Sequence, residues 1–230
     1  IALAVIAAVW FAQRQPETLL PSLRRPFRAT TLAAGLREVL RSRIAMGYTL
    51  ATGLIFGAFL AYLSTAQQIF SITFDRGTLF ALYFAIAALA IGAASLVNSL
   101  LVMRLGMRRL SVLAVLGLSA LSLAFLVPVS VASGMPDFWL FMTWLLASFF
   151  CIGILFGNLN AIALEPLGHI AGMGAAIIGS LSNIISLPIA WLLGQQFSGS
   201  ATPLVVGFAA MGIAAFGAMC WAECGIPKHG

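Results

Sequence analysis

Rings and hydroxyls at helical spacing, inside a long apolar segment, are the side chains of this sequence best suited to bind another molecule. Thr52, Phe56 and Phe59 project to one side of a helix at about 100 degrees per residue. Tyr62 lies at the edge of the same side. Such a surface binds amphipathic ligands by ring contact and hydrogen bonding. We therefore expect part of a ligand cavity here, with ordinary helix packing as the alternative for each residue alone.

Two further apolar segments carry polar side chains. At heptad-like spacing, segment 138–159 contains Trp144, Ser148, Cys151 and Asn158. This stripe lies opposite Gly153 and Gly157, which favours a helix neighbour behind the glycines and a cavity in front. Asn183, among several serines, makes segment 171–194 the most polar at its centre, for which hydrogen bonds between helices and cavity lining are alternatives. The candidate cavity residues are thus Thr52, Phe56, Phe59, Tyr62, Trp144, Ser148 and Asn183.

Catalysis is not expected from these residues. The sequence has no His-Glu-x-x-His or Gly-x-Ser-x-Gly motif, and its three cysteines have neither a metal-binding nor a disulfide pattern. His169 stands alone just before an apolar segment, where a structural hydrogen bond is more common than proton transfer. We therefore predict no enzyme activity, no metal and no cofactor.

The composition fixes the class of protein. Of the 230 residues, 62% are hydrophobic and 8% charged, and the mean hydropathy is +1.07, which is typical of an integral membrane protein. Because the apolar runs are continuous, the fold predicted is all-α rather than a barrel. Basic residues beside membrane segments account for the net charge of +6 through topology and lipid contact, so nucleic acid is not an expected partner.

Six segments are long and apolar enough to cross a bilayer, and none contains a charged residue. They are Ile44–Ala66, Thr78–Val102, Leu110–Val131, Phe138–Leu159, Ala171–Gly194 and Pro203–Trp221. If Arg43 lies on the cytoplasmic side, 11 of the 12 basic residues fall on that side and only Arg76 lies outside. The positive-inside rule therefore predicts this topology, with a cytoplasmic C-terminus.

The first 43 residues are predicted to join these segments to something upstream. Residue 1 is not Met, and the apolar run over 1–12 is too short to span a bilayer, so we interpret the chain as a fragment that opens at the end of a helix. The polar segment 13–43 contains an amphipathic helix, capped by Thr30 or Thr31, that would anchor at the membrane surface; a solvated linker is the alternative. The expected order is a helix end over 1–12, a cytoplasmic loop over 13–43, six membrane helices over 44–222 and a cytoplasmic tail over 223–230.

A short basic turn, Asn98 to Arg109, separates the second and third segments. Met103 to Arg109 carries a charge of +3 and must lie on one face of the membrane. The candidate gating residues of this cytoplasmic turn are Asn98, Arg104, Gly106, Arg108 and Arg109.

Three motifs resemble the major facilitator superfamily and, within it, the Bcr/CflA-type bacterial drug:proton antiporters. Pro16-Glu17-Thr18-Leu19 is similar to the end of the family's sixth helix. The basic turn resembles the second-half copy of the superfamily loop motif Asp-Arg-x-Gly-Arg-Arg, with Met103 in place of the acid. Pro166 to Gly172 resembles the start of helix eleven.

The resemblance implies that the six segments are helices seven to twelve of a twelve-helix transporter of the bacterial inner membrane. It implies alternating access, with amphipathic drugs bound at mid-membrane and the proton gradient as energy source. The implied partners are membrane lipids, such small-molecule substrates and an N-terminal six-helix half of the same chain, which would carry the proton-coupling acid. Gln67-Gln68 and Met173-Gly174 depart from the pattern. A carrier for one specific metabolite and a non-transporting six-helix protein are the alternatives; substrate identity, stoichiometry and oligomeric state do not follow from the sequence.

Overall fold

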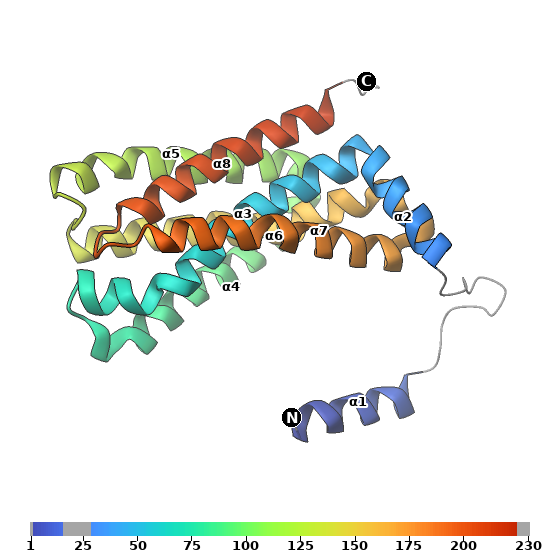
Figure 1. The fold of residues 1–230 in the computed structure, drawn as a ribbon, viewed down its shortest axis with the longest axis horizontal. Coiled ribbons are helices and arrows are strands. Elements are labelled where there is room, and N and C mark those ends of the chain that lie inside the picture. The colour runs from blue at the N-terminus through green and yellow to red at the C-terminus, as the bar shows by residue number, and fades with distance from the viewer. Residues whose placement is uncertain (1, 16–28, 225–230) are drawn as a thin grey trace. The chain divides into compact units, whose positions relative to one another are not determined.

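The computed structural model describes residues 2–15 and 29–224, and every regular element within these ranges is a helix (Figure 1). The chain forms two compact units, Ile1–Ala34 and Gly35–Gly230. In the first unit, α1 (Ala2–Arg14) is exposed along its length. The motif Pro16-Glu17-Thr18-Leu19 lies outside the described residues.

Six long helices make up most of the second unit. They are α3 (Arg43–Gln68), α4 (Phe80–Leu105), α5 (Met107–Val131), α6 (Phe138–Leu164), α7 (Ala171–Gln195) and α8 (Thr202–Glu223). Their bounds agree with the six predicted segments within three residues, except that α6 continues to Leu164 instead of ending at Leu159. At about 1.5 Å per residue, helices of 22 to 27 residues exceed the roughly 30 Å of a bilayer core.

Three short helices connect the long ones. The π-helix η2 (Ile69–Thr73) continues α3, the 3-10 helix η3 (Gly77–Leu79) precedes α4, and the 3-10 helix η4 (Glu165–Ile170) lies between α6 and α7. Five helical segments of the described chain are long and apolar enough to span a membrane. One of these, Phe138–Gln195, contains both α6 and α7, which are separated where Leu167 leaves the helical conformation. The predicted all-α membrane fold is therefore confirmed.

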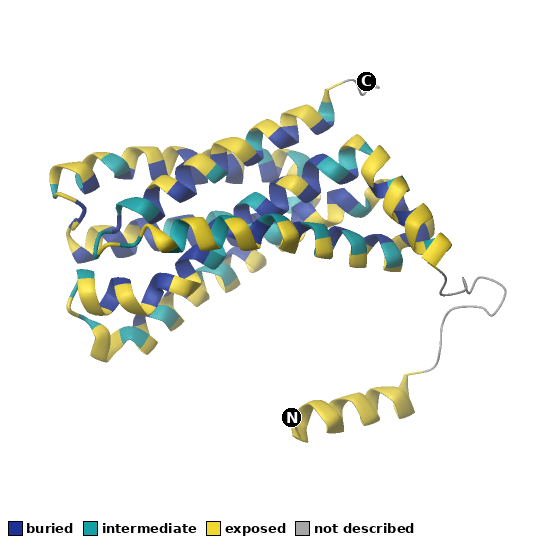
Figure 2. Cartoon of the chain, viewed as in Figure 1, coloured by how far each residue is buried: buried dark blue, intermediate teal, exposed yellow. Residues whose placement is uncertain are grey.

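Helices α3 and α6 form the centre of this unit. Helix α3 packs against α6, α7 and α8, whereas α6 packs against α3, α4 and α5, and α5 and α8 pack against each other. Buried residues accordingly concentrate on the inner sides of the helices (Figure 2). In the segment that contains α3, 61% of the most apolar stretch is buried. In the segment that contains α4, the buried share of the corresponding stretch is only 17%. Helix α4 therefore lies at an edge of the unit.

Glycines permit the closest approach in this bundle. An added Cβ at Gly53 or Gly57 would lie 2.8 Å from Ile185 or Ile189 of α7, and one at Gly153 would lie 2.7 Å from the Cβ of Ala94 on α4. From the sequence, the four-residue spacing of Gly53 with Gly57, of Gly153 with Gly157 and of Gly168 with Gly172 predicts such close packing. The prediction is confirmed for Gly53, Gly57 and Gly153. It is wrong for three others, which have no neighbouring atom within 4 Å of an added Cβ: Gly157, Gly168 and Gly172.

The basic turn is tighter than the sequence indicates. Helix α4 continues to Leu105 and α5 begins at Met107, so the expected loop from Met103 to Arg109 is reduced to Gly106. Gly106 has φ +77, a conformation that side-chain-bearing residues rarely adopt, and this lets the chain reverse within one residue. Arg104 and Arg108 consequently belong to helix ends.

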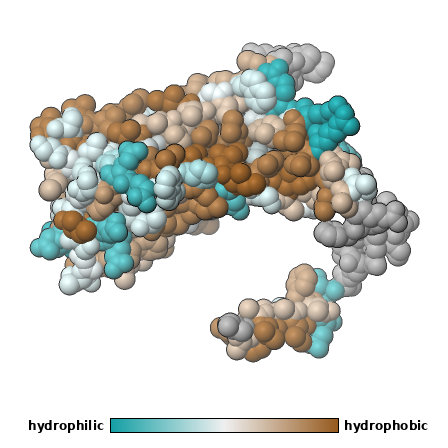
Figure 3. Space-filling model, viewed as in Figure 1, coloured by the Kyte–Doolittle hydropathy of each residue, from teal (hydrophilic) through white to brown (hydrophobic). Residues whose placement is uncertain are grey.

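Hydrophobic side chains dominate the visible face of the second unit, and hydrophilic ones gather toward its ends (Figure 3). We name these ends by an arginine on each. The Arg108 end comprises the starts of α3 and α5, η4 and the end of α8; the Arg76 end comprises η2, η3 and the starts of α4, α6 and α8.

Candidate functional site

Aromatic rings from three helices meet in a cluster. We call it the aromatic cluster; it consists of Phe56, Phe59 and Tyr62 on α3, Phe84 on α4, and Phe149 and Phe156 on α6. The Phe59 ring lies 5.4 Å, centroid to centroid, from both Phe149 and Phe156, and Phe56 lies 5.8 Å from Phe156. These are edge-on contacts, the geometry that aromatic pairs prefer. The structure thus brings three of the predicted cavity residues together.

The cluster is only partly covered. Phe56, Phe59 and Phe156 are half-buried, whereas Tyr62 is fully buried and Phe149 nearly so. Half-exposed rings backed by buried ones form a surface that an apolar ligand can contact without displacing the core. Phe149 and Phe156, spaced by seven residues, were missed in the sequence, although this spacing places them on one face of α6.

The Tyr62 hydroxyl is a polar atom without a partner in this aromatic surrounding. Tyr62 stacks on Phe84 at 6.3 Å and meets Phe149 edge-on at 4.8 Å. Within the described residues, its hydroxyl has no hydrogen-bond partner. The hydroxyl oxygen is buried, and a buried unpaired polar group costs about 1–3 kcal/mol of stability.

Trp144 and Ser148 belong to a different part of the unit. Trp144 stacks on Phe125 of α5 at 5.2 Å and contacts Phe208 of α8 at 5.4 Å, and its indole N–H donates to the Ser122 hydroxyl at 3.3 Å. Ser148 is fully buried, and its hydroxyl has no partner among the described residues. Trp144 therefore faces α5 and α8 and contacts no ring of the aromatic cluster in the described chain. The cavity role of Trp144 and Ser148 stays a prediction.

Among the described residues, no side-chain hydrogen bond joins the remaining predicted cavity residues, Thr52 and Asn183, to the aromatic cluster. The Thr52 hydroxyl donates to the carbonyl of Tyr48 in its own helix at 2.8 Å. Asn183 is exposed on α7. A neighbouring serine, Ser182, instead makes the bond between helices, donating to the Thr49 carbonyl at 3.3 Å.

Arg108 joins three elements at the end of the unit that bears its name. Its guanidinium lies 2.6 Å from Glu165 of η4 and 2.8 Å from Glu223 of α8. The Tyr48 hydroxyl of α3 donates to the same Glu223 oxygen at 2.9 Å. We call these four side chains the Arg108 hub. The alternating topology predicted from the sequence puts both carboxylates on the same side as the basic turn, which is the signal that could have paired them.

The other residues of the predicted gating turn have separate surroundings. Arg104 and Arg109 are exposed. Asn98 lies inside α4, where it forms a reciprocal amide pair with Asn158 of α6: each side-chain N–H donates to the other's oxygen, at 3.2 and 2.7 Å. Asn98 therefore links two helices. The gating roles of these residues are not tested by this geometry.

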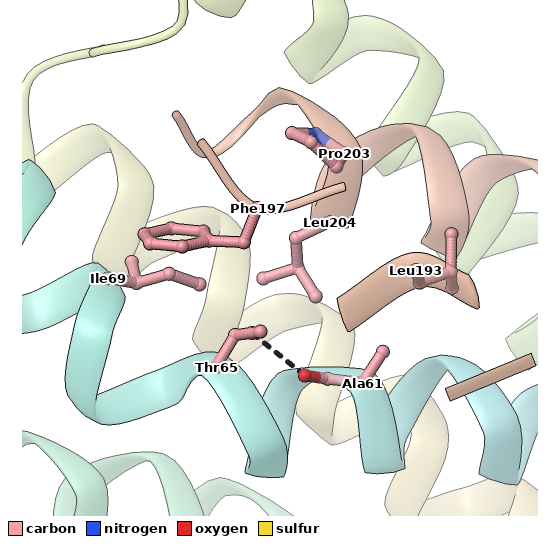
Figure 4. Close-up of a pocket in the computed structure, with 7 residues that line it drawn as sticks. All are labelled: Ala61, Thr65, Ile69, Leu193, Phe197, Pro203 and Leu204. Atoms are coloured by element: carbon pink, nitrogen blue, oxygen red, sulfur yellow. Dashed lines mark hydrogen bonds between the residues drawn. The ribbon is translucent and has the colours of Figure 1, made fainter. Parts of the chain in front are cut away.

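A small apolar pocket lies elsewhere in the unit (Figure 4). It is lined by Ala61, Thr65, Ile69, Leu193, Phe197, Pro203 and Leu204. The Thr65 hydroxyl is turned to the Ala61 carbonyl at 2.8 Å. With about 10 Å³ of free volume, the pocket holds one water molecule at most. It is too small for an organic substrate and contains none of the predicted cavity residues.

The comparisons with known proteins identify the family. Comparison with curated proteins and with solved structures gave no match. The family model described as Major Facilitator Superfamily matches residues 1–190, which is most of the chain and includes the aromatic cluster and Arg108. The chain therefore belongs to the Major Facilitator Superfamily, a family of membrane transporters.

Proposed function

We propose that this chain is part of a proton-coupled exporter of amphipathic drugs that works by alternating access. The observation that carries the proposal is the aromatic cluster, whose half-exposed rings belong to the two central helices. Charged side chains of α3 to α8 lie only in the first or last turns of these helices. A binding surface of half-exposed rings favours apolar and amphipathic molecules over carboxylates or phosphates, which would need a fixed cation.

Alternating access requires one end of the helices to open while the other is closed. The Arg108 hub supports such a cycle, because its bonds join α3, α5, η4 and α8, and its three charged side chains are each more than a third exposed, although Tyr48 is buried. Exposed ion pairs contribute little stability each, so separating them is cheap. We assign this end to the cytoplasm from the distribution of basic residues.

The remaining parts of the proposal concern what surrounds the chain. The facing wall of the cavity would come from a preceding six-helix half, which would also hold the proton-coupling acid. The proton gradient would supply the energy, and the membrane would be the bacterial inner membrane, with the C-terminus cytoplasmic.

Accumulation assays with the full-length gene test the proposal. An efflux-deficient bacterium expressing it should accumulate less of an amphipathic drug, and an uncoupler should restore accumulation. Phe59→Leu should weaken export about five-fold or more, because the ring loses its edge-on contacts to Phe149, Phe156 and ligand.

The matched control is Phe216→Leu. Phe216 is half-buried like Phe59, but it lies on α8 and outside the aromatic cluster. Export should be unchanged in this variant. Equal loss in both variants would contradict the cluster as the binding surface. A wild-type protein in the membrane that changes accumulation of no drug in a varied panel would instead favour a carrier of one metabolite.

A further inference from the structure

The aromatic cluster does not end at Tyr62 and Phe84 but continues as a row of rings to the Arg76 end. We call it the aromatic row; in order of contact it consists of Tyr62, Phe84, Phe80, Phe70, Tyr83 and Phe138. Successive ring centroids lie 6.3, 5.5, 5.8, 5.7 and 4.8 Å apart. The row is contributed by α3, η2, α4 and α6. Its rings are in contact from the aromatic cluster to the Arg76 end, and Tyr62, Phe70, Tyr83 and Phe138 are buried.

A cation of the protein itself occupies the end of this row. The Arg76 guanidinium lies 4.7 Å from the centroid of the Phe138 ring, and its Nη1 donates to the Tyr83 hydroxyl at 3.5 Å. Among residues 29–224, Arg76 forms no ion pair with a carboxylate, although Asp75 precedes it in the sequence. The positive charge therefore lies against the face of one ring, Phe138, and beside the phenol oxygen of Tyr83.

The position of the Arg76 guanidinium indicates which ligands the Phe138 ring can bind. A ring face attracts a cation through its quadrupole, and a flat delocalised cation such as guanidinium also stacks on it. An organic cation with aromatic rings offers the same two interactions. It would have to displace the Arg76 side chain to make them.

We propose that Arg76 is a specificity residue that competes with planar organic cations for the Phe138 face at the end of the aromatic row. The inference rests on the proposed drug export and adds to it a substrate class and a release step. A planar cation that leaves at the Arg76 end contacts the Phe138 face while Arg76 is displaced, and Arg76 returns to Phe138 once the cation has left. By keeping the terminal ring occupied, Arg76 weakens cation binding there and favours release.

Binding measurements on the purified full-length transporter test this step. Ethidium serves as the planar cation and Nile red as an uncharged aromatic probe, each followed by fluorescence. In Arg76→Gln the Kd for ethidium should fall about two- to five-fold, the range expected for an exposed cation–π contact, while the Kd for Nile red stays unchanged. Arg76→Lys keeps a cation beside the ring and should retain most of the wild-type Kd for ethidium.

A second set of variants removes the ring itself through Phe138→Leu. Without the ring there is no face to compete for, so Arg76→Gln added to Phe138→Leu should leave the Kd for ethidium at the Phe138→Leu value. Thermal unfolding of every variant is measured as a control that the variants fold like the wild type. Three results would overturn the inference. They are a lower Kd for ethidium in Arg76→Gln that persists when Phe138 is replaced by Leu, an equal change in the Kd of both probes, and an unchanged Kd for ethidium.

The inference and the proposed function fail differently. A wild-type transporter that exports ethidium under a proton gradient, combined with an unchanged Kd in Arg76→Gln, overturns the role of Arg76 alone. A wild-type protein that neither binds nor exports either probe overturns the drug-export proposal, and the role of Arg76 with it.

Discussion

The two ends of the six-helix unit are closed by different physical interactions. At the Arg108 end, partly exposed charged side chains form ion pairs, and the buried Tyr48 donates a hydrogen bond to one of them. At the Arg76 end, buried rings such as Phe70 and Phe141 pack together, and the cation present is held by a ring. Ion pairs in water are reversible, salt-dependent and individually weak, whereas ring packing depends on shape and is lost as a cavity opens. The six-helix unit is therefore held more firmly at the Arg76 end than at the Arg108 end.

The largest effect is expected from breaking the ring packing. Phe70 is fully buried and contacts the rings of Phe80, Tyr83, Phe138 and Phe141. Phe70→Ala should lower the free energy of unfolding by about 3–5 kcal/mol, because it leaves a cavity among aromatic side chains. Unfolding of the purified protein in detergent measures this. Phe216 is half-buried and has no aromatic partner in the described chain, so Phe216→Ala should lower the free energy of unfolding much less. Equal losses of unfolding free energy in the two variants would contradict the contrast between the two ends.

A charge reversal at the other end should have a smaller effect. Arg108→Glu places a third carboxylate beside Glu165 and Glu223, and we expect a loss of about 1–2 kcal/mol, limited by solvent exposure. Adding Glu223→Arg should restore part of it, since opposite charges again face each other. The same unfolding assay measures both variants. A double variant no more stable than Arg108→Glu would show that the hub depends on more than charge.

The positions of the helices could be predicted from the sequence, because continuous apolar runs must span the bilayer as helices. Gly53 and Gly57 also indicated a packed face of α3. What a helical wheel cannot supply is which neighbour covers each face. The sequence predicted a cavity on the Trp144 side of α6, but α5 and α8 cover Trp144. The aromatic cluster instead contacts α6 through Phe149 and Phe156.

The turn shows the same limit at the level of the backbone. Arg104, Arg108 and Arg109 marked a boundary between two helices, but α-helical hydrogen bonding continues to Leu105 and resumes at Met107. Basic side chains at helix ends reach water without unwinding the backbone, so charge alone overestimates the length of a loop. The positive φ of Gly106 is a conformational property that composition does not reveal.

An intermediate effect is expected from the amide pair between α4 and α6. Asn158→Leu leaves the Asn98 amide unpaired, and the free energy of unfolding should fall by about 1 kcal/mol, as for hydrogen bonds between membrane helices. The double variant Asn98→Leu with Asn158→Leu should be at least as stable as the single one, since no buried amide is left without a partner. A double variant that loses the sum of both single effects would contradict the reciprocal pair.

The smallest effect, and the sharpest separation of the two ends, is expected from salt. At about 1 M ionic strength the screening length falls to roughly 3 Å, which weakens exposed ion pairs but leaves ring packing intact. When NaCl is raised from about 0.15 to 1 M, the free energy of unfolding of the wild type should therefore fall. This fall should exceed that of Arg108→Gln, in which the ion pairs are absent, by a few tenths of a kcal/mol. In Phe70→Ala the salt response should equal that of the wild type, because the ion pairs of the hub are unaffected. A salt response that survives in Arg108→Gln would assign it to other charges, and the contrast between an ionic end and an aromatic end would then fail.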